Sequence, residues 1–538
     1  MYLLFPGRHH LLTRFQHEYL SMLGSEGLWG AIDVNGKALE IQKSIKCLVF
    51  AITSANHHQT RRNPLPLYQR AMMIQDFSSD FPFPSNVIPI EDIGHSENFA
   101  EYTIKKIEAE SDGRLKLTPE NTLIVCSSPV LKLYQELGYR ILPVERLPGE
   151  KEKFVTKQPW QVLETIAKSN LPFNEMDDYA NYVHPASKRL WQEYGILARV
   201  RMLFNDKLIG DDGDLTESRD YNTYVREMDE IAELKFNETK EFIRPGRIGD
   251  IGCAVGSWIK LATSEPALFE SDFYGVEIAR KLYDICGQRK ENGDFQNTNV
   301  FFLRKNAVTG LVFPPSSMKT IHTSSLTHEI ESYGDRKSLL SFLKNRYEEL
   351  VVGGVWINRD VVGPEDKEQQ VYLWLNDGDG MNDLEPKSFT QKADKKKYLD
   401  SLSTYAKFFV FQREFRKDQS YQLNYSIVFI EGRNYLHLTL KDACEFLSKK
   451  DYTDNWDSEM HESFCFFSFS EWKDIMKQTG FQIVSGSHAY ANPWIINQRY
   501  VSKAEIYSSN AKTPTLYADL ISIPFPVTNM LLVGVKQG

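Results

Sequence analysis

The sequence predicts an α/β protein with two Rossmann-like parallel-sheet domains, joined by a helical linker, with an insertion or cap in the second domain. The chain has 538 residues, which is more than one domain of ordinary size. Short apolar runs alternate with amphipathic segments in the first ~165 residues and again from about 245 onwards. Alternating strand and helix signals are typical of a parallel sheet with helices on its faces.

The expected domain boundaries follow changes in this pattern. We expect a first domain at 1–165, a helical segment at 166–244 and a second domain at 245–538. The middle segment has apolar residues at helical spacing, and a break containing Pro and Gly at 243–247 ends it. Residues 364–465 are richer in charged and aromatic residues and lose the alternation, so they are predicted to form the insertion or cap.

Each predicted strand is a short apolar run. In the first domain the runs are 2–5, 47–52, 86–90 and 122–126, with amphipathic helices expected at 98–110 and 130–139. Helical spacing is clearest at 186–204 and 226–243 in the middle segment. In the second domain, an alternating α/β unit is expected to start at 247–256, and strands are expected within 299–307, 318–330, 350–360 and 529–535, with a helix-and-strand set at 469–486.

Composition excludes several classes of protein. Hydrophobic residues make up 42% and charged residues 25%, as in an ordinary globular protein. No apolar run reaches the ~18–20 residues that a membrane span needs. The net charge of -9 disfavours nucleic acid as a partner. The six cysteines form no C-x-x-C pair, so a zinc ribbon is not expected, and no residue is assigned as a metal ligand. These features, and an N-terminus unlike a signal peptide, predict a cytoplasmic protein. The oligomeric state is left open.

A glycine-rich turn with a distant acid is the strongest motif. It reads Asp250-Ile-Gly252-Cys-Ala254-Val-Gly256, between a strand and a helical run. Gly252 permits a tight turn, and small residues let the backbone approach a ligand. Glu277 ends the next predicted strand, where a carboxylate can accept both ribose hydroxyls of a nucleoside. A glycine-rich turn beside an unrelated acid is the simpler alternative.

These residues resemble class I S-adenosylmethionine (SAM)-dependent methyltransferases over 245–362 and again near 469–536. The resemblance implies that SAM is the cofactor. Asn306 stands where the family often has an acid that contacts the adenine, and Ser325 opens an S-x-x-H-E run typical of small-molecule methyltransferases. The residues that the resemblance assigns to cofactor binding are Asp250, Gly252, Ala254, Gly256, Glu277, Asn306, Ala307 and Ser325.

Candidate catalytic and acceptor-binding residues lie beyond the later strands. His328 titrates near neutrality and is a candidate base, or a residue that only holds the loop or SAM. Glu329 is its neighbour, and Asp360 follows the fifth strand of the domain as a second candidate. The segment 446–464 is dense in charge and aromatics, which suits either a lid over a small-molecule acceptor or a solvated face. Its candidate substrate-binding residues are Lys450, Tyr452, Trp456 and Glu459.

The N-terminal segment carries a second constellation. A strand runs into Gly7-Arg8 and a His-rich turn before a helix, which is a favourable seat for a triphosphate. Residues 2–145 resemble HIGH-motif nucleotidyltransferases of the nicotinamide mononucleotide adenylyltransferase group, archaeal branch. The family's H-x-G-H falls on residues 13–16, with Gln16 in place of its second histidine. The resemblance implies a nucleoside triphosphate with Mg²⁺, a catalytic Arg70, and binding by Gly7, Arg8, His10, Thr13, Gln16, Ser54, Asn63, Asp92 and Lys157.

Three functions remain open from the sequence. The first is a bifunctional enzyme, in which a methyltransferase for a small polar metabolite is fused to a nucleotidyltransferase that couples a nucleoside triphosphate to a phosphorylated small molecule. The second is a methyltransferase with a non-catalytic nucleotide-binding module. The third is an RNA-end-modifying protein, which the acidic charge disfavours.

Overall fold

The computed structural model divides the chain into two compact units, Met1–Gly213 and Asp214–Gly538. The division falls inside the range 166–244 that the sequence assigns to a helical linker. The structure describes residues 1–538 except 94–97, 127–129, 145–156, 173–174, 206–220 and 512–513, and except the side chains of 177, 178, 180 and 221–227.

The first unit is built on a five-stranded sheet, here called the first sheet. Its strand order is β3-β2-β1-β4-β5 and all neighbouring strands are parallel. The strands consist of buried apolar runs because a parallel sheet is covered on both faces. Their bounds are β1 Tyr2–Gly7, β2 Cys47–Ile52, β3 Ser85–Pro89, β4 Thr122–Val125 and β5 Arg140–Leu142.

Helices cover both faces of the first sheet. One face packs against α1, α2 and α5–α8, and the other against α3 and α4. The helices between residues 159 and 205 therefore bury their apolar side chains in the core of the first unit. The helix bounds are α1 Arg14–Glu26, α2 Leu67–Phe77, α3 Phe99–Glu110, α4 Leu131–Glu136, α5 Pro159–Lys168, α6 Asp177–Tyr182, α7 Pro185–Glu193 and α8 Ile196–Asn205.

The second unit contains a larger sheet, here called the main sheet, with the order β14-β18-β10-β9-β6-β7-β8. Neighbouring strands among β8, β7, β6, β9 and β10 are parallel, whereas β18 runs antiparallel to β10. The order reverses between β6 and β9, and open α/β sheets bind ligands outside the carboxyl ends of their strands at such a point. The bounds are β6 Arg247–Ile251, β7 Asp272–Val276, β8 Val300–Leu303, β9 Met318–Ser324, β10 Leu350–Val361, β14 Phe481–Ile483, β15 His488–Tyr490 and β18 Asn529–Lys536.

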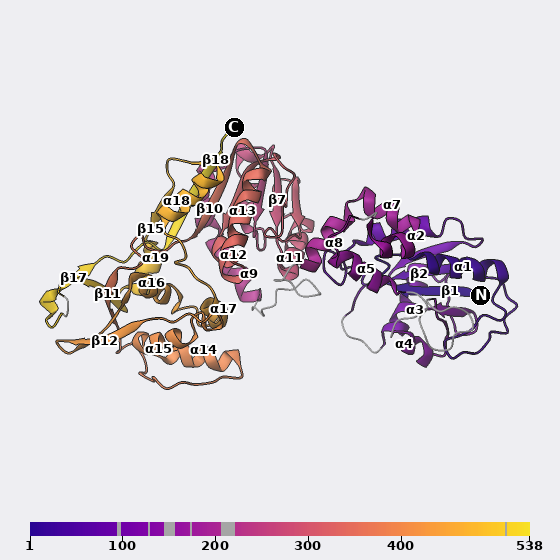
Figure 1. The fold of residues 1–538 in the computed structure, drawn as a ribbon, viewed down its shortest axis with the longest axis horizontal. Helices are drawn as coiled ribbons and strands as arrows, with labels where there is room; N and C mark the ends of the chain where they lie inside the picture. Colours follow the sequence, from indigo (N-terminus) through magenta and orange to yellow (C-terminus); the bar gives the residue numbers. More distant parts are fainter. Residues whose placement is uncertain (94–97, 127–129, 145–156, 173–174, 206–220, 512–513) are drawn as a thin grey trace. The chain divides into compact units, whose positions relative to one another are not determined.

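Helices lie on both faces of the main sheet as well (Figure 1). Side chains of α13 and α18 form the core on one face, and side chains of α9, α10 and α11 form the core on the other. The short helix α12 follows β9. The bounds are α9 Tyr221–Thr239, α10 Ser257–Ala262, α11 Arg280–Glu291, α12 Thr327–Tyr333, α13 Arg336–Glu349 and α18 Phe469–Thr479.

A third sheet, here called the inserted sheet, is antiparallel and has the order β12-β13-β11-β16-β17. Three of its strands come from the predicted insertion, and two come from residues 504–523. Its helices bury an aromatic core against one face. The bounds are β11 Gln370–Leu375, β12 Tyr425–Ile430, β13 Arg433–Thr439, β16 Ala504–Ser509, β17 Leu520–Ile523, α14 Lys392–Ser401, α15 Thr404–Glu414, α16 Leu440–Lys449, α17 Trp456–His461 and α19 Pro493–Ile495.

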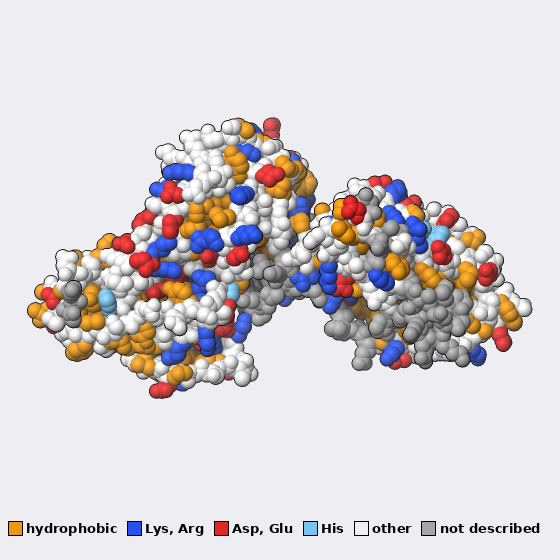
Figure 2. Space-filling model, in the orientation of Figure 1, with side chains coloured by type: hydrophobic (Ala, Val, Ile, Leu, Met, Phe, Trp, Pro, Cys, Tyr) orange, Lys and Arg blue, Asp and Glu red, His pale blue; other side chains and the backbone are white. Residues whose placement is uncertain are grey.

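The predicted fold class, α/β with two parallel sheets, is confirmed. No helix in the described part of the chain combines the length and the apolarity that a membrane crossing requires. On the face shown in Figure 2, basic and acidic side chains of the described residues are interspersed over both units.

Candidate active site

The turn after β6 adopts a left-handed backbone at three positions. The φ angle is +75° at Gly252, +49° at Ala254 and +76° at Gly256. A Cβ atom in this region costs about 1–2 kcal/mol, which explains the two glycines. A Cβ atom at Gly252 would also lie 3.2 Å from Cδ1 of Leu326. The turn after β6 therefore lies against the turn after β9, at the reversal of the strand order.

Glu277 follows β7 and binds the turn. Its Oε2 accepts a hydrogen bond from Ala254 N at 2.9 Å, and its Oε1 accepts from the N–H groups of Ile278 and Ala279 at 2.8 Å. Burial raises the pKa of Glu277 to about 7 although these N–H groups lower it. Each carboxylate oxygen has about two acceptor positions. Oε2 keeps one for a ligand hydroxyl, whereas Oε1 would have to exchange a backbone bond to hold a second hydroxyl.

Asp250 supports the turn from within the sheet. Its Oδ1 lies 2.7 Å from Nδ1 of His322 in the neighbouring strand β9, and both side chains are buried. The indole of Trp258 stacks on that imidazole with 4.1 Å between ring centroids. The pair joins β6 to β9 directly before the turn, so Asp250 acts here as a structural support. Its role in cofactor binding stays a prediction.

The loop after β8 holds Asn306 and Ala307, and a buried ion pair fixes it. Arg346 donates to both carboxylate oxygens of Glu349 at 2.8 Å and to the Ala307 carbonyl at 3.3 Å. Glu349 in turn accepts from the backbone N of Val312 at 2.6 Å. Asn306 Oδ1 accepts from the Val308 N–H at 2.9 Å.

His328 is fixed by Asp360. His328 Nδ1 lies 2.6 Å from Asp360 Oδ1, which also accepts from Val361 N at 2.8 Å. Asp360 Oδ2 accepts from Thr327 N at 2.6 Å, from Thr327 Oγ1 at 2.5 Å and from His328 N at 3.2 Å. The Asp360 side chain is fully buried. Five donors occupy its acceptor positions, so Asp360 can orient His328 but has no position left for a substrate.

The second imidazole nitrogen of His328 faces Glu462. Nε2 of His328 lies 3.4 Å from Oε2 of Glu462, and both side chains are buried. Burial lowers the pKa of His328, but Asp360 and Glu462 outweigh it and raise the pKa well above the usual range. The imidazole is therefore protonated at neutral pH, and a protonated imidazole cannot accept a proton. The role of His328 as a base stays a prediction, and this charge state does not favour it.

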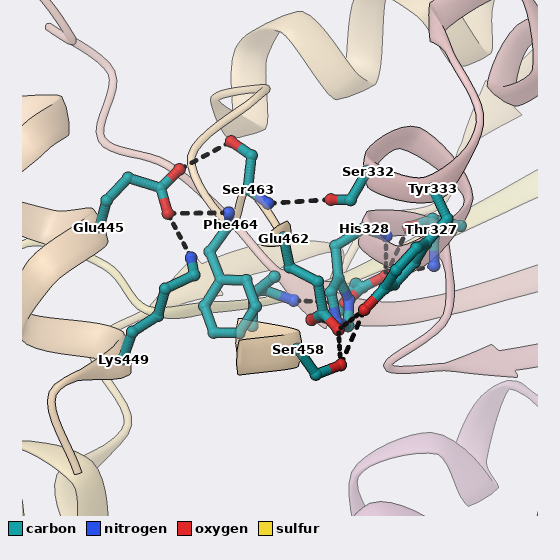
Figure 3. A network of polar contacts seen from close by, with 12 residues as sticks. Thr327, His328, Ser332, Tyr333, Glu445, Lys449, Ser458, Glu462, Ser463 and Phe464 are labelled. Carbon is teal, nitrogen blue, oxygen red and sulfur yellow. Dashed lines mark hydrogen bonds and ion pairs between the residues drawn. The ribbon is translucent and has the colours of Figure 1, made fainter. Parts of the chain in front are cut away.

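Hydroxyl groups and a second buried ion pair position Glu462 (Figure 3). Its Oε1 accepts from Tyr333 Oη at 3.2 Å and from Ser458 Oγ at 3.4 Å. Shortly after Glu462 in the chain, the N–H groups of Phe464 and Cys465 donate to Glu445 of α16, at 3.0 Å and 2.8 Å.

Lys449 forms an ion pair with Glu445, and both side chains are fully buried. Burial raises the pKa of Glu445, but Lys449 and the backbone donors outweigh it and lower the pKa. Ser463 N donates to Ser332 Oγ of α12 at 2.8 Å. The segment 462–465 is thus tied at one side to α16 and at the other to α12.

Helix α9 brings a cation to the same edge of the main sheet. Burial and the nearby Arg359 lower the pKa of Lys235 to about 8. The carboxylates of Asp250, Asp360 and Glu329 act in the opposite direction and raise it. Arg359 itself donates to Glu238 of α9 at 2.5 Å. Ser325, with φ +53°, donates its N–H to the Arg359 carbonyl at 2.8 Å. Glu329 is half-buried.

The predicted acceptor residues of the insertion lie mostly elsewhere. Trp456 is buried in the aromatic core under the inserted sheet and donates to Glu414 at 2.7 Å. Lys450 binds Asp451 and the Arg499 carbonyl, each at 2.6 Å, and Arg499 covers the ring of Tyr452. These three side chains hold the inserted subdomain together. Glu459, on α17, is half-buried. Within 446–464, Glu462 reaches Nε2 of His328, and the ring of Phe464 packs edge-on against the imidazole with 5.1 Å between ring centroids.

In the first unit, a buried arginine joins the loops at the carboxyl ends of β1 and β2. Arg70 donates to the carbonyls of Thr53 at 2.9 Å, Ser54 at 3.0 Å, Arg8 at 3.3 Å and His57 at 3.4 Å. Burial, with the charge of Arg8, lowers the pKa of Arg70 to about 10. Its position makes Arg70 a structural support of both loops. Contact with a substrate stays a prediction.

Other predicted nucleotide-binding residues gather at the same edge. Ser54 Oγ donates to Asp92 at 2.9 Å, and His10 Nε2 lies 3.3 Å from Asn63 Oδ1. Burial, followed by the charge of Arg70, lowers the pKa of His10 well below its usual range, so its imidazole is neutral. Gly7 is the last residue of β1.

Three predicted residues have local partners instead. Thr13 Oγ1 accepts from Gln16 N at 3.2 Å, and Gln16 Oε1 accepts from Thr13 N at 3.0 Å. This is a capping box at the start of α1, and both side chains are buried. The H-x-G-H position thus serves helix capping here. Lys157 is exposed, with its ammonium 5.6 Å from the ring centroid of Tyr182.

The donor set at the turn after β6 suits a nucleoside. The described residues contain no group of three or more His, Cys, Asp or Glu side chains that could hold a metal. Glu277 Oε2 keeps an acceptor position for a ribose hydroxyl. Sequence reasoning missed Glu462, Tyr333 and Ser458. Glu462 lies at the end of the dense segment 446–464, which is the only sequence signal that could have found it.

Comparisons with known proteins find similar solved structures but no matching family. No protein-family model and no curated protein matches it. Similar solved structures include a SAM-dependent methyltransferase from Thermotoga maritima, 16% identical over 59% of this chain and 97% of that one, with a TM-score of 0.29. Geranyl diphosphate C-methyltransferase from Streptomyces coelicolor is 9% identical, covers 60% and 86%, and has a TM-score of 0.29. The YcgJ protein from Bacillus subtilis is 14% identical, covers 57% and 99%, and has a TM-score of 0.28. Likenesses at these scores carry no argument about activity.

Proposed function

We propose that the second unit is a SAM-dependent methyltransferase that acts on a small polar metabolite. The observation that carries this proposal is the bond between Glu277 and the turn after β6, 2.9 Å long, at the reversal of the strand order. A glycine-rich turn next to a buried carboxylate suits a nucleoside, with the ribose at Glu277 and the adenine near Asn306. Bound there, SAM would supply an electrophilic methyl group.

The chain's own residues have distinct roles in this proposal. Gly252 and Gly256 allow the left-handed backbone of the turn, and the Arg346–Glu349 pair holds the loop that carries Asn306. Asp360 orients His328, and His328 presents a positive charge rather than a lone pair at neutral pH. The acceptor lies near the Nε2 side of His328, where Glu462 completes the site.

Calorimetric titration of SAM at pH 8 tests the proposal. Glu277→Gln keeps an acceptor for the backbone N–H groups but removes the charge, so affinity should fall at least about tenfold. Glu291→Gln, an exposed position at the end of α11, should leave affinity unchanged. Unchanged affinity in Glu277→Gln, or no binding by the native chain, rejects this function.

For the first unit we propose a nucleoside triphosphate site, which is the second candidate function. Arg70 supports it, because its four hydrogen bonds in the described structure go to carbonyl oxygens and none to a carboxylate. A buried cation of this kind, with Arg8 nearby, suits a phosphate. Transfer of a nucleotidyl group to a phosphorylated small molecule, with Mg²⁺, is the corresponding activity.

Thermal stabilisation by ATP with Mg²⁺ tests this second proposal. Arg8→Gln removes a charge without disturbing the four carbonyl bonds of Arg70, and it should abolish the stabilisation. Arg14→Gln, on the outer part of α1, is the matched control and should retain it. Equal stabilisation in both variants contradicts a site at this edge.

A further inference from the structure

Helix α9 carries a lysine on its buried face. The side chains of Ala232, Phe236 and Thr239 are buried, and their spacing places them on one face of the helix. Lys235 lies on this same face, between Ala232 and Thr239. A lysine is seldom found in such a position, because an ammonium is costly to bury. Its position is therefore not that of an ordinary surface charge.

Bonds on both sides of this lysine fix the helix. The carboxylate of Asp229 lies 2.7 Å from the guanidinium of Arg289 in α11. Glu238 accepts from Arg359 of β10 at 2.5 Å and from Tyr490 of β15 at 3.0 Å. The helix thus holds the lysine between these two anchors, with its side chain toward the main sheet.

The ammonium of Lys235 has no direct partner in the described part of the chain. It forms neither a hydrogen bond nor an ion pair there, although the charges of Asp250, Asp360 and Glu329 act on it. Asp250 binds His322 instead, at 2.7 Å, and five donors surround Asp360. Asp250 and Asp360 belong to β6 and β10, and Glu329 follows β9. Lys235 therefore lies near the carboxyl ends of three neighbouring strands.

The surroundings of Lys235 favour the loss of its proton. The side chain is half-buried, yet burial is the largest cause that lowers its pKa to about 8, followed by the charge of Arg359. A group that keeps accessible area and is still strongly desolvated lies in a recess, not on the outer surface. The three carboxylates raise this pKa, and the histidines at the same edge, His322 and His328, are bound to two of them. Since an exposed lysine has a pKa near 10.4, Lys235 carries a lone pair far more often than such a lysine at pH 8.

We propose that Lys235 is the proton acceptor of the methyl transfer, and that the methyl acceptor accordingly attacks through an O–H or N–H group. This inference rests on the proposed function and adds to it a catalytic base and a substrate class. It is carried by the place of Lys235 at the reversal of the strand order, where the turn of Gly252 also lies. His328 is protonated at neutral pH and does not fill this role.

The proposed step conserves atoms and charge. The oxygen or nitrogen of the acceptor bonds to the methyl carbon of SAM, and the carbon–sulfur bond breaks with its electron pair going to sulfur. The proton of the acceptor passes to the amine of Lys235. The products are the methylated acceptor, S-adenosylhomocysteine and the Lys235 ammonium, which returns its proton to water before the next turnover. A positioned base of this kind typically contributes about 10²–10⁴-fold to a rate.

The test follows the protonation of Lys235 in the full chain labelled with ¹³Cε-lysine. The signal is assigned by its loss in Lys235→Gln, and Lys240→Gln, at an exposed position directly after the helix, is the matched control. We expect Lys235 in the ligand-free chain to titrate with a midpoint near pH 8. A midpoint above about pH 10 would leave an ammonium at neutral pH and overturn the proposal. If Lys235→Gln does not fold, Lys235→Arg provides the same assignment.

Cofactor titrations then place Lys235 relative to the reacting methyl group. SAM and S-adenosylhomocysteine differ by that methyl group and by one positive charge on sulfur. A sulfonium about 6 Å from the amine, at an effective dielectric constant of about 40, lowers the pKa by about one unit. The midpoint should therefore be about one pH unit lower with SAM than with S-adenosylhomocysteine. Equal midpoints would place Lys235 away from the methyl group and overturn the proposal.

Calorimetry separates a failure of this inference from a failure of the proposed function. If neither ligand binds, the proposed function fails, and the role of Lys235 as a base falls with it. If both bind and the midpoints are equal, only the role of Lys235 is overturned. Lys235→Gln removes a charge that repels the sulfonium, so SAM should bind this variant at pH 7 at least as tightly as the native chain. A loss of more than about tenfold, in protein whose melting temperature is retained, would make Lys235 an anchor of the cofactor and contradict the proposal.

Discussion

At the carboxyl edge of the first sheet the buried charge is a guanidinium among carbonyl oxygens, whereas at the carboxyl edge of the main sheet a buried imidazole lies between two carboxylates. Arg70 is held by four backbone carbonyls, and the histidine beside it, His10, is kept neutral. His328 is instead held between two carboxylates and kept protonated. Two edges with the same topology therefore impose opposite charge states on their histidines.

This difference bears on the ligands that each edge can accept. A buried cation surrounded by carbonyl oxygens favours an anion such as a phosphate, whereas the buried carboxylate of Glu277 favours hydroxyl donors. The parallel-sheet architecture alone says nothing of this, because ligand class depends on which side chains follow each strand.

The largest expected effect comes from removing the positive charge between the two carboxylates. His328→Gln should destabilise the second unit by about 3–5 kcal/mol at pH 7, since the buried carboxylate of Asp360 loses its charged partner. His328→Gln combined with Asp360→Asn should recover part of this loss. The free energy of unfolding is measured by urea denaturation. Hydrogen exchange in peptides of β9 and β10 follows this unfolding in the second unit alone.

The same comparison has a predicted pH dependence. The folded pKa of His328 is raised, so its stabilisation is fully present below the unfolded value of 6.5 and is lost as pH rises through the folded pKa. The difference between the native chain and His328→Gln should therefore shrink at alkaline pH. A difference that grows with pH would mean that His328 is neutral when buried.

A smaller effect is expected at the turn. Gly252→Ala places a Cβ atom at a residue with φ +75° and 3.2 Å from Leu326 Cδ1. It should lower the free energy of unfolding by roughly 1–3 kcal/mol and remove most of the affinity for SAM. Gly287→Ala is the matched control: it lies in α11 with nothing within 4 Å of the new Cβ, and helix propensity should stabilise the chain by up to about 1 kcal/mol. Thermal unfolding and SAM titration of both variants provide the comparison. Equal changes of the same sign would contradict a specific requirement at the turn.

The smallest effect concerns the first unit. Thr13→Ala removes the N-cap of α1 and should cost about 1 kcal/mol of stability, whereas stabilisation by ATP should persist. Arg8→Gln should show the reverse. If Thr13→Ala abolishes the response to ATP without affecting stability, the capping box is incidental and Thr13 contacts the ligand.

Elements that depend on local sequence could be predicted. The turn from Gly252 to Gly256 follows a buried strand, and positions with a left-handed backbone favour glycine. The position of this turn can therefore be predicted from the sequence. Glu277, His328 and Asp360 follow apolar runs that form strands of one parallel sheet. Because the carboxyl ends of such strands share one edge, their proximity followed from the fold class.

Long-range packing explains what sequence reasoning missed. The inserted sheet takes strands from 370–439 and from 504–523, and the helix and strands at 469–490 lie between them in the chain. Glu462 is 134 residues from His328, and hydrogen bonds of its neighbours to Glu445 of α16 and to Ser332 of α12 bring it there. Trp456 and Lys450 have the composition of a binding surface, but their side chains serve packing and internal hydrogen bonds. Polar and aromatic content cannot distinguish these two uses.

The central claim, that Glu277 holds the ribose of SAM, is tested most directly by the pH dependence of affinity. The pKa of free Glu277 is raised to about 7 by burial. Ribose hydroxyls donate to the ionised form, so binding should lower that pKa, and affinity should rise with pH until about pH 7 and then level off. Calorimetry should give a gain of about tenfold for the native chain relative to Glu277→Gln between pH 6 and pH 8, because the ligand titrates identically with both proteins. A ratio of affinities that does not change with pH would contradict the assignment of the ribose to Glu277.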